Sequence, residues 1–378
     1  MTSLSSQIIT TANSWAIRMA DSILHSYPPA EWKWHYEHGL LVKAFSEIGS
    51  AAGDSRYSQL VRAWVDHFIT AGGHIRTYCA TEFNLDQVNP GKLLFPLYRQ
   101  TGDSRYARAI QLIQSQLRQQ PRTESGGFWH KKIYPQQMWL DGLYMAQPFS
   151  AQYALIFDEP AIFDDIVHQF TLMDEHACDP DTGLLYHAWD ESRRQKWADP
   201  KTGCSPNFWG RGIGWYAMAL VDVLDFLPET HSGHPILVKI LVRVANALLH
   251  FQDPITGLWY QVVDKLDRPD NYRESSASAM LVYVFAKAVR MGFLDSDFLS
   301  AAGRAYRGLL ENMIKVDSSG DLTLEGTCST AGLGSIPYRD GTYEYYVSEK
   351  TSPNDFKGVG PFILAALEAE AWRRAKTP

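Results

Sequence analysis

Two kinds of helical segment alternate along the chain. The first kind is amphipathic, with apolar side chains at helical spacing on one face, as in Leu60, Val61, Trp64, Val65 and Phe68. Segments of this kind lie near residues 5–26, 57–71, 104–120, 160–176, 234–252 and 295–315. Two of them follow the sequence GDSRY, whose Asp or Ser is a suitable helix N-cap. We therefore expect six helices that each bury one face.

The second kind of segment begins with small residues, often Gly, and continues almost wholly apolar. These segments start at Tyr36, Leu85, Leu140, Gly210, Glu274 and Lys357. A helix that is apolar on nearly all sides is buried on nearly all sides. Six buried helices alternating with six amphipathic ones predict two concentric rings, which is an all-α (α/α)6 barrel formed by residues 1–378 as one domain. An irregular helical array is the alternative that the pattern leaves open.

Turn signals followed by short β-prone stretches precede several of the buried segments. They are GGFWHK at 126–131, DPDTGLLYH at 179–187 and DPITGLWYQ at 253–261. We expect short β-hairpin loops on the rim from which the inner helices start. The stretch 326–355, ahead of the last buried segment, shows no periodicity, and we expect a long structureless loop. Loops of this length inside a compact domain are commonly functional.

Composition narrows the classes of function. The net charge is −7 and no basic run occurs, so we expect neither a nucleic-acid nor a membrane partner. The 12 Trp and 19 Tyr suit the stacking of sugar rings, although an aromatic core explains them equally well. The four Cys lie far apart without a CxxC pair or a Cys–His cluster, so we expect no metal. The chain shows neither signal-peptide pattern nor bilayer-length apolar run, and we expect a cytoplasmic protein.

Unusual polar residues gather at the starts of the buried segments. They are Tyr36, His38, Asp86, Gln87, Asp141, Arg211, Glu274 and Lys357, and the expected hairpins add His130 and His187. In a double ring all six starts face one mouth, where helix N-termini favour an anion. Trp209 and Trp215 flank these positions, and the combination predicts a sugar site. Ordinary N-caps at Asp86 and Asp141 stay open, as does a loop position for Asp141 if Pro148 marks a first turn.

Five motifs in this order carry a family resemblance. LDQVNPGKLL, MWLDGLYMAQPF, LLYHAWDE, FWGRGIGWYAMAL and DFKGVGPFILAALE together resemble the unsaturated rhamnogalacturonyl hydrolases of glycoside hydrolase family 105. The similarity extends from about Trp34 to Trp372. It implies an (α/α)6 barrel that needs no cofactor. It also implies removal of the Δ4,5-unsaturated galacturonyl residue from the non-reducing end of pectin oligosaccharides left by lyases.

The resemblance also implies roles for single residues. Asp141 matches the general acid/base and Asp86 the second essential acid, while the implied sugar contacts are His187, Arg211, Trp215, Tyr36, His130, Trp209 and Lys357. The unsaturated substrate is an enol ether. Protonation at C4 by Asp141 gives an oxocarbenium ion at C5, water adds there, and the resulting hemiketal opens and expels the remaining sugar chain.

Several alternatives stay open at this point. The related unsaturated glucuronyl hydrolases share the fold and the acid pair, although GRGIGWYAM and GVGPFILA look more like the rhamnogalacturonyl group. An ordinary inverting glycosidase would use Asp86 and Asp141 as its acid–base pair. A sugar epimerase would depend on His130 and His187, and a non-enzymatic protein would bind sugar without turnover. The sugar beside the unsaturated residue is open, and so is the choice between monomer and homodimer.

Overall fold

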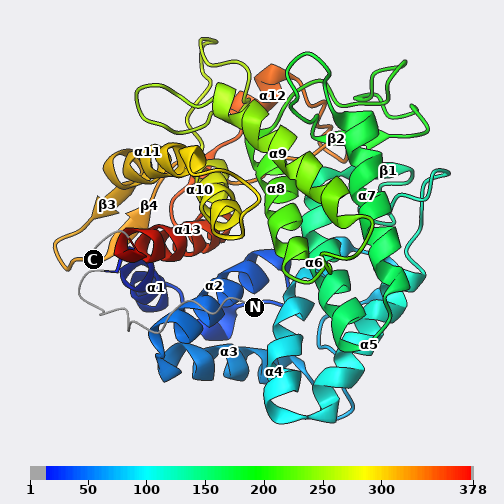
Figure 1. Cartoon of the computed structure of the whole chain (residues 1–378), viewed down its shortest axis with the longest axis vertical. Helices are drawn as coiled ribbons and strands as arrows, with labels where there is room; N and C mark the ends of the chain where they lie inside the picture. Colours follow the sequence, from blue (N-terminus) through cyan, green and yellow to red (C-terminus); the bar gives the residue numbers. More distant parts are fainter. Residues whose placement is uncertain (1–13, 376–378) are drawn as a thin grey trace.

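The computed structural model describes residues 14–375, in which helices form two rings (Figure 1). The inner ring contains α2 (Tyr36–Ala52), α4 (Leu94–Thr101), α6 (Leu140–Ile156), α8 (Gly210–Leu224), α10 (Ser275–Arg290) and α13 (Phe356–Ala375). The outer ring contains α1 (Trp15–Ser26), α3 (Ser55–Phe68), α5 (Ser104–Arg118), α7 (Ala161–Ala177), α9 (His234–His250) and α11 (Asp297–Asn312). The expected all-α barrel is confirmed. Residues 5–13 of the first amphipathic segment lie outside the described residues.

The inner ring closes because α13 packs against both α10 and α2, so red and blue ribbons lie side by side in Figure 1. Each outer helix packs on the inner helix next to it in the chain. Glycines allow the close approaches inside the ring. A Cβ on Gly39 would lie 2.9 Å from Pro90, and one on Gly360 would lie 2.7 Å from Leu40. The small residues that mark the buried segments therefore have a packing role.

The outer helices follow the sequence pattern closely. Helix α3 buries Tyr57, Val61, Trp64, Val65 and Phe68 against the inner ring. The repeated GDSRY motif acts as expected, because its Asp side chain accepts a hydrogen bond from the helix N-terminus in both copies. Asp54 accepts from the backbone N–H of Arg56 at 2.9 Å, and Asp103 accepts from that of Arg105 at 2.8 Å.

The second inner segment is not the continuous helix expected from Leu85. It begins with two 3-10 turns, η4 (Leu85–Gln87) and η5 (Asn89–Leu93), and becomes α-helical only as α4. Pro90 lacks an N–H and sits in the first turn of η5, which is compatible with a break there. Two further 3-10 turns are η2 (Pro29–Glu31) and η3 (Ala80–Glu82). Asp86 therefore lies in the tight turn η4. The following turn, η5, packs between α2 and α6.

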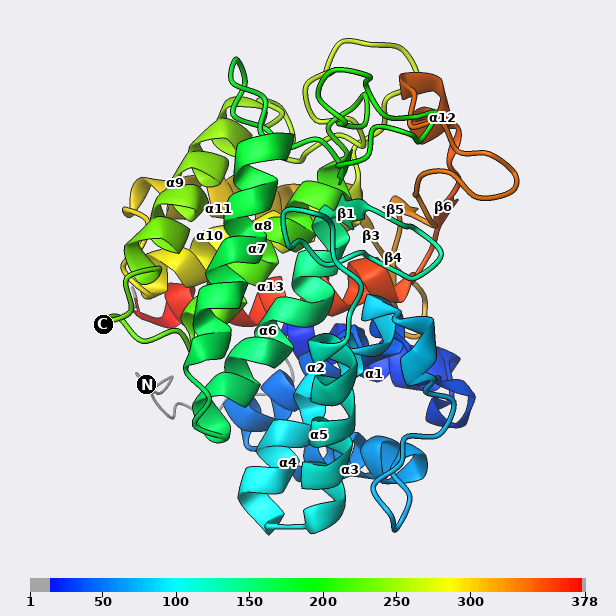
Figure 2. The same ribbon diagram turned by 90° about the vertical axis from the view of Figure 1, so that its right-hand side faces the viewer.

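Short antiparallel strand pairs join the loops of one rim. Within residues 14–375, β1 (Gln137–Trp139) pairs with β2 (Ala188–Asp190), β3 (Ile314–Val316) with β4 (Leu322–Leu324), and β5 (Thr327–Cys328) with β6 (Thr351–Ser352). The stretch 326–355 is not structureless, because it contains β5, β6 and helix α12 (Tyr343–Ser348). Figure 2 shows α12 with β1, β5 and β6 on one side of the helix ring. No helix in the described part of the chain has the length and apolarity needed to cross a bilayer.

Candidate active site

A strand pair brings two of the expected site residues together. In the β1–β2 ladder, Trp139 lies opposite Ala188, and the backbone N–H of Leu140 donates to the carbonyl of His187 at 3.1 Å. Asp141 follows as the second residue of α6, and His187 directly precedes β2. Asp141 Oδ2 and His187 Nε2 are 3.3 Å apart. Residues separated by 46 positions therefore meet because a local ladder fixes their register.

Asp141 does not serve as a helix cap. The N-cap of α6 is Trp139, and no side chain caps that helix. Pro148 lies inside α6 without ending it, so the loop position left open for Asp141 is wrong. The side chain of Asp141 is 16% exposed, and its Oδ2 is buried without a hydrogen bond to any described residue. Because Oδ2 is buried beside His187, the exposed part of the Asp141 carboxyl is the part that a ligand can reach.

His187 is held from its other side by Tyr346 of α12. The Tyr346 hydroxyl lies 2.7 Å from His187 Nδ1, and both side chains are fully buried. Burial raises the pKa of Tyr346 well above its usual range, so the phenol keeps its proton. When this proton is donated to Nδ1, the neutral imidazole carries its own proton on Nε2, facing Asp141. The rings of Trp139 and Trp209 enclose the imidazole at 5.2 and 4.5 Å.

Asp86 is the anionic centre of a second cluster. Its Oδ2 lies 2.5 Å from Lys131 Nζ, and its Oδ1 lies 3.4 Å from His130 Nε2. Burial by itself would raise the pKa of Asp86, but the positive charge of Lys131 and the contact with His130 outweigh it and lower the pKa. Burial also lowers the pKa of His130 to about 4, so this imidazole is neutral near pH 7. Asp86 is not a cap either, because Asn84 caps η4 through the N–H of Asp86.

An aromatic stack links the two acid clusters. The imidazole of His130 lies parallel to Trp139 with ring centroids 5.0 Å apart, and Tyr134 stacks on Trp139 at 4.7 Å. Backbone hydrogen bonds fix this arrangement, since His130 accepts from the N–H of Leu85 at 3.2 Å and donates to Gln137 at 3.0 Å. The turn carrying Asp86 and the strand leading to Asp141 are thereby tied to one hairpin.

Arg211 lies in the first turn of α8 and is 1% exposed. One of its terminal nitrogens, Nη1, donates to the carbonyl of Cys328 at 2.5 Å and lies 3.8 Å from Glu274 Oε1. Glu274 caps α10 by accepting from the N–H of Ala277 at 2.6 Å, and it also accepts from the N–H of Cys328 at 2.9 Å. The guanidinium is therefore fixed by the 326–355 stretch and by α10, and it lies 4.8 Å from the Trp209 ring.

Aromatic side chains form the layer below these polar groups. Trp215 stacks on Tyr144 at 4.8 Å and meets the edge of Tyr36 at 6.2 Å. Burial raises the pKa of Tyr36 well above its usual range. The charges of Glu37, Asp86 and Asp141 add to this effect, and Arg211 opposes it. Tyr36 therefore lies within the electrostatic influence of both acids and of Arg211.

Lys357 stands at the junction that closes the ring. Its Nζ lies 2.9 Å from Glu37 Oε1 on α2 and 2.9 Å from Asp355, and the side chain is 6% exposed. The expected sugar contact at Lys357 stays a prediction, and the structure shows a lysine whose charge is already matched by two carboxylates.

Three residues at this mouth were not selected from the sequence for the site. Lys131 is adjacent to His130, which was selected, but nothing in the sequence indicates that Lys131 faces Asp86. Glu274 stood among the polar residues at helix starts but was given no role. Tyr346 lies in the 326–355 stretch, whose length pointed to function without singling out a residue. Within residues 14–375, no group of three or more His, Cys, Asp or Glu side chains is arranged to hold a metal ion.

Comparison with known proteins gives a consistent result. The family described as Glycosyl Hydrolase Family 88 matches residues 8–372. A solved glycoside hydrolase from family 105 of C. acetobutylicum is 42% identical, covers 94% of this chain and 99% of its own, and superposes with a TM-score of 0.92. The unsaturated rhamnogalacturonyl hydrolase YesR of Bacillus subtilis is 29% identical over 255 residues, which are 66% of this chain and 69% of that protein.

A more distant structure shares the fold. The unsaturated glucuronyl hydrolase of Bacillus sp. GL1 is 14% identical, covers 94% of this chain and 95% of its own, and has a TM-score of 0.70.

Proposed function

The chain belongs to glycosyl hydrolase family 88 and the related family 105 of unsaturated uronyl hydrolases, and from this premise we propose its substrate and residue roles. The proposed reaction removes the Δ4,5-unsaturated galacturonyl residue from the non-reducing end of rhamnogalacturonan oligosaccharides that lyases produce. The name of the YesR relative, a rhamnogalacturonyl hydrolase, supports this substrate. The observation that carries the residue roles is the setting of Asp141, a partly exposed carboxyl at the start of α6 whose buried Oδ2 lies 3.3 Å from His187 Nε2.

Asp141 acts first as an acid in the proposed mechanism. Its proton goes to C4 of the enol ether, the C4–C5 double bond becomes a single bond, and the positive charge at C5 is shared with the ring oxygen. The resulting carboxylate then takes a proton from a water that adds to C5. The product is a hemiketal at C5, and its ring opens by breaking the bond between C5 and the ring oxygen, which gives a ketone at C5 and a hemiacetal at C1. The hemiacetal then collapses to an aldehyde, and the leaving sugar departs with the hydroxyl proton. His187 holds its Nε2–H toward the carboxylate and so favours the ionised state that forms during the first step.

Asp86 has a different role in the proposed mechanism. Both of its oxygens are engaged, one by Lys131 and the other by His130, and its pKa is lowered. An acid held in this way stays ionised, and we assign it to orienting the substrate hydroxyls or the attacking water. This engagement disfavours the inverting mechanism, which requires a free carboxylate to activate water opposite Asp141. We assign Arg211 to binding the uronate carboxylate, because a guanidinium suits that group.

The test uses the absorbance of the conjugated double bond. The protein is given unsaturated galacturonyl-rhamnose and, separately, an unsaturated glucuronyl disaccharide derived from a glycosaminoglycan. We expect the ultraviolet absorbance to disappear, with release of a reducing sugar, and to do so faster with the rhamnose-containing substrate. A preference for the glucuronyl disaccharide refutes the substrate assignment, and turnover of saturated oligosaccharides alone refutes the mechanism.

Asp141→Asn tests the proton donor directly. Asn keeps the shape of the side chain but has no carboxyl proton, so we expect the rate to fall by at least a thousandfold, about 4 kcal/mol of barrier, with an unchanged melting temperature. Asp181→Asn is the matched control, because Asp181 is exposed in the turn between α7 and β2. Retention of more than a tenth of the activity in Asp141→Asn contradicts the role given to this residue.

A further inference from the structure

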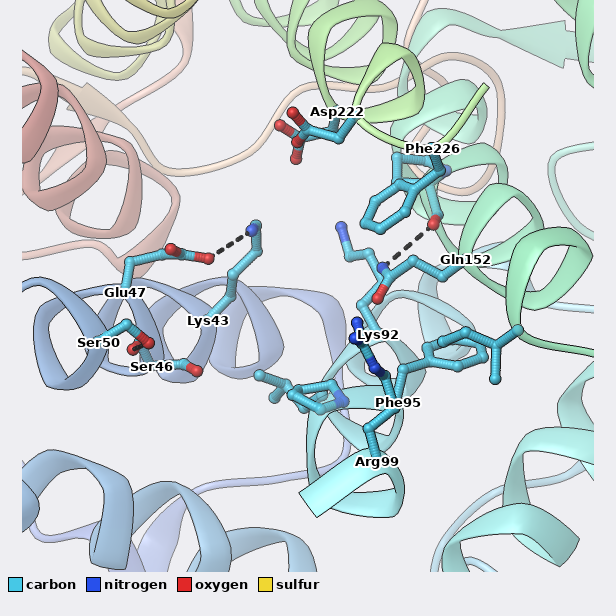
Figure 3. A pocket seen from close by; sticks show the side chains of 15 residues that line it. Lys43, Ser46, Glu47, Ser50, Lys92, Phe95, Arg99, Gln152, Asp222 and Phe226 are labelled. Carbon is cyan, nitrogen blue, oxygen red and sulfur yellow. Dashed lines mark hydrogen bonds and ion pairs between the residues drawn. The ribbon is translucent and has the colours of Figure 1, made fainter. Parts of the chain in front are cut away.

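A polar cavity lies in the half of the barrel remote from Asp141. This distal cavity has a volume of about 270 Å³ and is lined from α2, η5, α4, α6 and α8 (Figure 3). Asp141 begins α6, whereas Pro148, Gln152 and Ile156 of the same helix line the distal cavity. At about 1.5 Å per residue, Gln152 lies roughly 16 Å further along the helix axis. The two sites therefore occupy opposite halves of the same helices.

Most charges at the distal cavity are paired with one another. Lys43 Nζ lies 3.1 Å from Glu47 Oε1. Lys287, just behind the lining, lies 2.8 Å from Asp222 and 2.6 Å from Asp225. Two lysines and three carboxylates are accounted for in this way, which leaves one negative charge in excess.

Two basic side chains of the lining, Lys92 and Arg99, remain without such partners among the described residues. Lys92 is 6% exposed, and its Nζ forms no hydrogen bond with any described residue, although it lies 3.7 Å from the centre of the Tyr144 ring. Burial lowers its pKa well below the usual range of a lysine. Arg99 is exposed at the edge of the distal cavity, and within residues 14–375 it has neither an ion pair nor a hydrogen bond. A bound anion favours the protonated form of Lys92, and with Lys92 and Arg99 both protonated the seven groups carry one net positive charge.

The opposite wall offers a hydrogen-bond acceptor. Asp222 Oδ1 accepts from Tyr283 at 2.7 Å and from Lys287, but Oδ2 is buried and has no donor among the described residues. Figure 3 shows the side chains of Lys43 and Lys92 reaching into the space that Asp222 faces. An anion alone would be repelled by Asp222 Oδ2, whereas a hydroxyl group can donate to it. The occupant therefore needs both a negative charge and hydroxyl groups.

The volume and lining of the distal cavity further restrict which ligand it can bind. Phe95 and Phe226 contribute apolar faces to the lining, which suit the C–H face of a sugar ring. The volume is just under the lower end of the usual range for ligand pockets, roughly 300–1,000 Å³, and matches a ligand of one ring. We propose that the distal cavity binds a small hydroxylated carboxylate the size of one uronic acid. Its carboxylate pairs with Lys92 and Arg99, and one hydroxyl donates to Asp222 Oδ2.

The probe is galacturonate, titrated into the full chain by isothermal calorimetry. Galactose has similar hydroxyl groups without the carboxylate, and acetate has the carboxylate without the hydroxyls. We expect saturable binding of galacturonate and at least tenfold weaker binding of the other two compounds. Arg99→Gln and Lys92→Met should each weaken galacturonate at least tenfold. Arg307→Gln, at an exposed position on the outer helix α11, is the control and should bind as the parent does.

The possible outcomes distinguish binding at the distal cavity from binding at the active site. Galacturonate bound at the mouth gives a site that is insensitive to Arg99→Gln, so a titration that loses one of two sites in this variant supports the proposal. Arg99 is exposed, and its variant is expected to fold even if Lys92→Met does not. The proposal is overturned if galacturonate does not bind, if Arg99→Gln leaves every binding site intact, or if galactose binds as tightly as galacturonate. None of these results depends on turnover at Asp141.

Discussion

Replacing Tyr346 with Phe removes one hydroxyl from behind the proposed general acid. The hydroxyl lies 2.7 Å from His187 Nδ1 in a fully buried setting. Phe keeps the ring that stacks on Trp209 at 6.2 Å, so the loss is confined to the hydrogen bond. A buried nitrogen left without a partner costs about 1–3 kcal/mol. We expect the free energy of unfolding to fall by this amount.

The same substitution is expected to slow the reaction. Without the phenol, either nitrogen of His187 can carry the proton, and the tautomer with a bare Nε2 facing Asp141 no longer supports the carboxylate. We expect kcat to fall about tenfold, which corresponds to about 1.4 kcal/mol of transition-state stabilisation. KM is expected to change little, because Tyr346 is fully buried behind His187 and has no surface to offer the sugar.

The absorbance assay measures kcat and KM, and urea unfolding measures stability. Tyr345→Phe is the matched control, since Tyr345 lies in the same helix and accepts a hydrogen bond from Gly332 rather than contacting His187. It is expected to retain kcat. A Tyr346→Phe variant that loses stability but keeps the parent kcat refutes the role of the tautomer, and one that loses neither refutes the buried hydrogen bond as well.

Three further predictions concern charges in the barrel. Burial lowers the pKa of His130 from 6.5 to about 4, so the unfolded chain binds the extra proton between these values. The free energy of unfolding should therefore fall by about 3 kcal/mol as the pH drops from 6.5 to 4, and His130→Gln should lose this component in urea titrations. Lys131→Met removes the cation that lowers the pKa of Asp86, so activity requiring ionised Asp86 should disappear at a higher pH on the acid side of the rate profile. Lys287→Met leaves two contacting carboxylates, one of them the buried Asp222, without their lysine and should destabilise the fold by about 3–5 kcal/mol in thermal or urea unfolding.

The sequence predicts the ring architecture because each ring imposes its own hydrophobic pattern. One buried face gives the helical spacing seen in α3, and burial on all sides gives the apolar run of α6. The break at Pro90 is less visible, since a proline near the start of a segment is compatible with either a helix or a turn. Helix α12 is not predicted from the hydrophobic pattern, because only two of its six residues, Tyr343 and Tyr346, are buried.

The candidate site was predictable as a set of positions but not as a set of contacts. Alternation along the chain implies that helix starts converge, and one hairpin does tie the turn of Asp86 to the strand that precedes Asp141. The pairing of Asp86 with Lys131, and of His187 with Tyr346, depends on strand register and on a loop that crosses the mouth. Neither follows from periodicity, because side chains about 45 and 160 positions apart meet only after tertiary structure has formed.

The closure of the ring by α13 against α2 also has a consequence for biosynthesis. Lys357 and Glu37 form their contact across 320 positions of the chain. The first inner helix, α2, therefore cannot complete its packing before the last one, α13, has formed. During translation, the apolar flank of α2 stays uncovered until α13 has left the ribosome. A nascent chain of this kind exposes apolar surface of α2 for as long as the helices between α2 and α13 are being made.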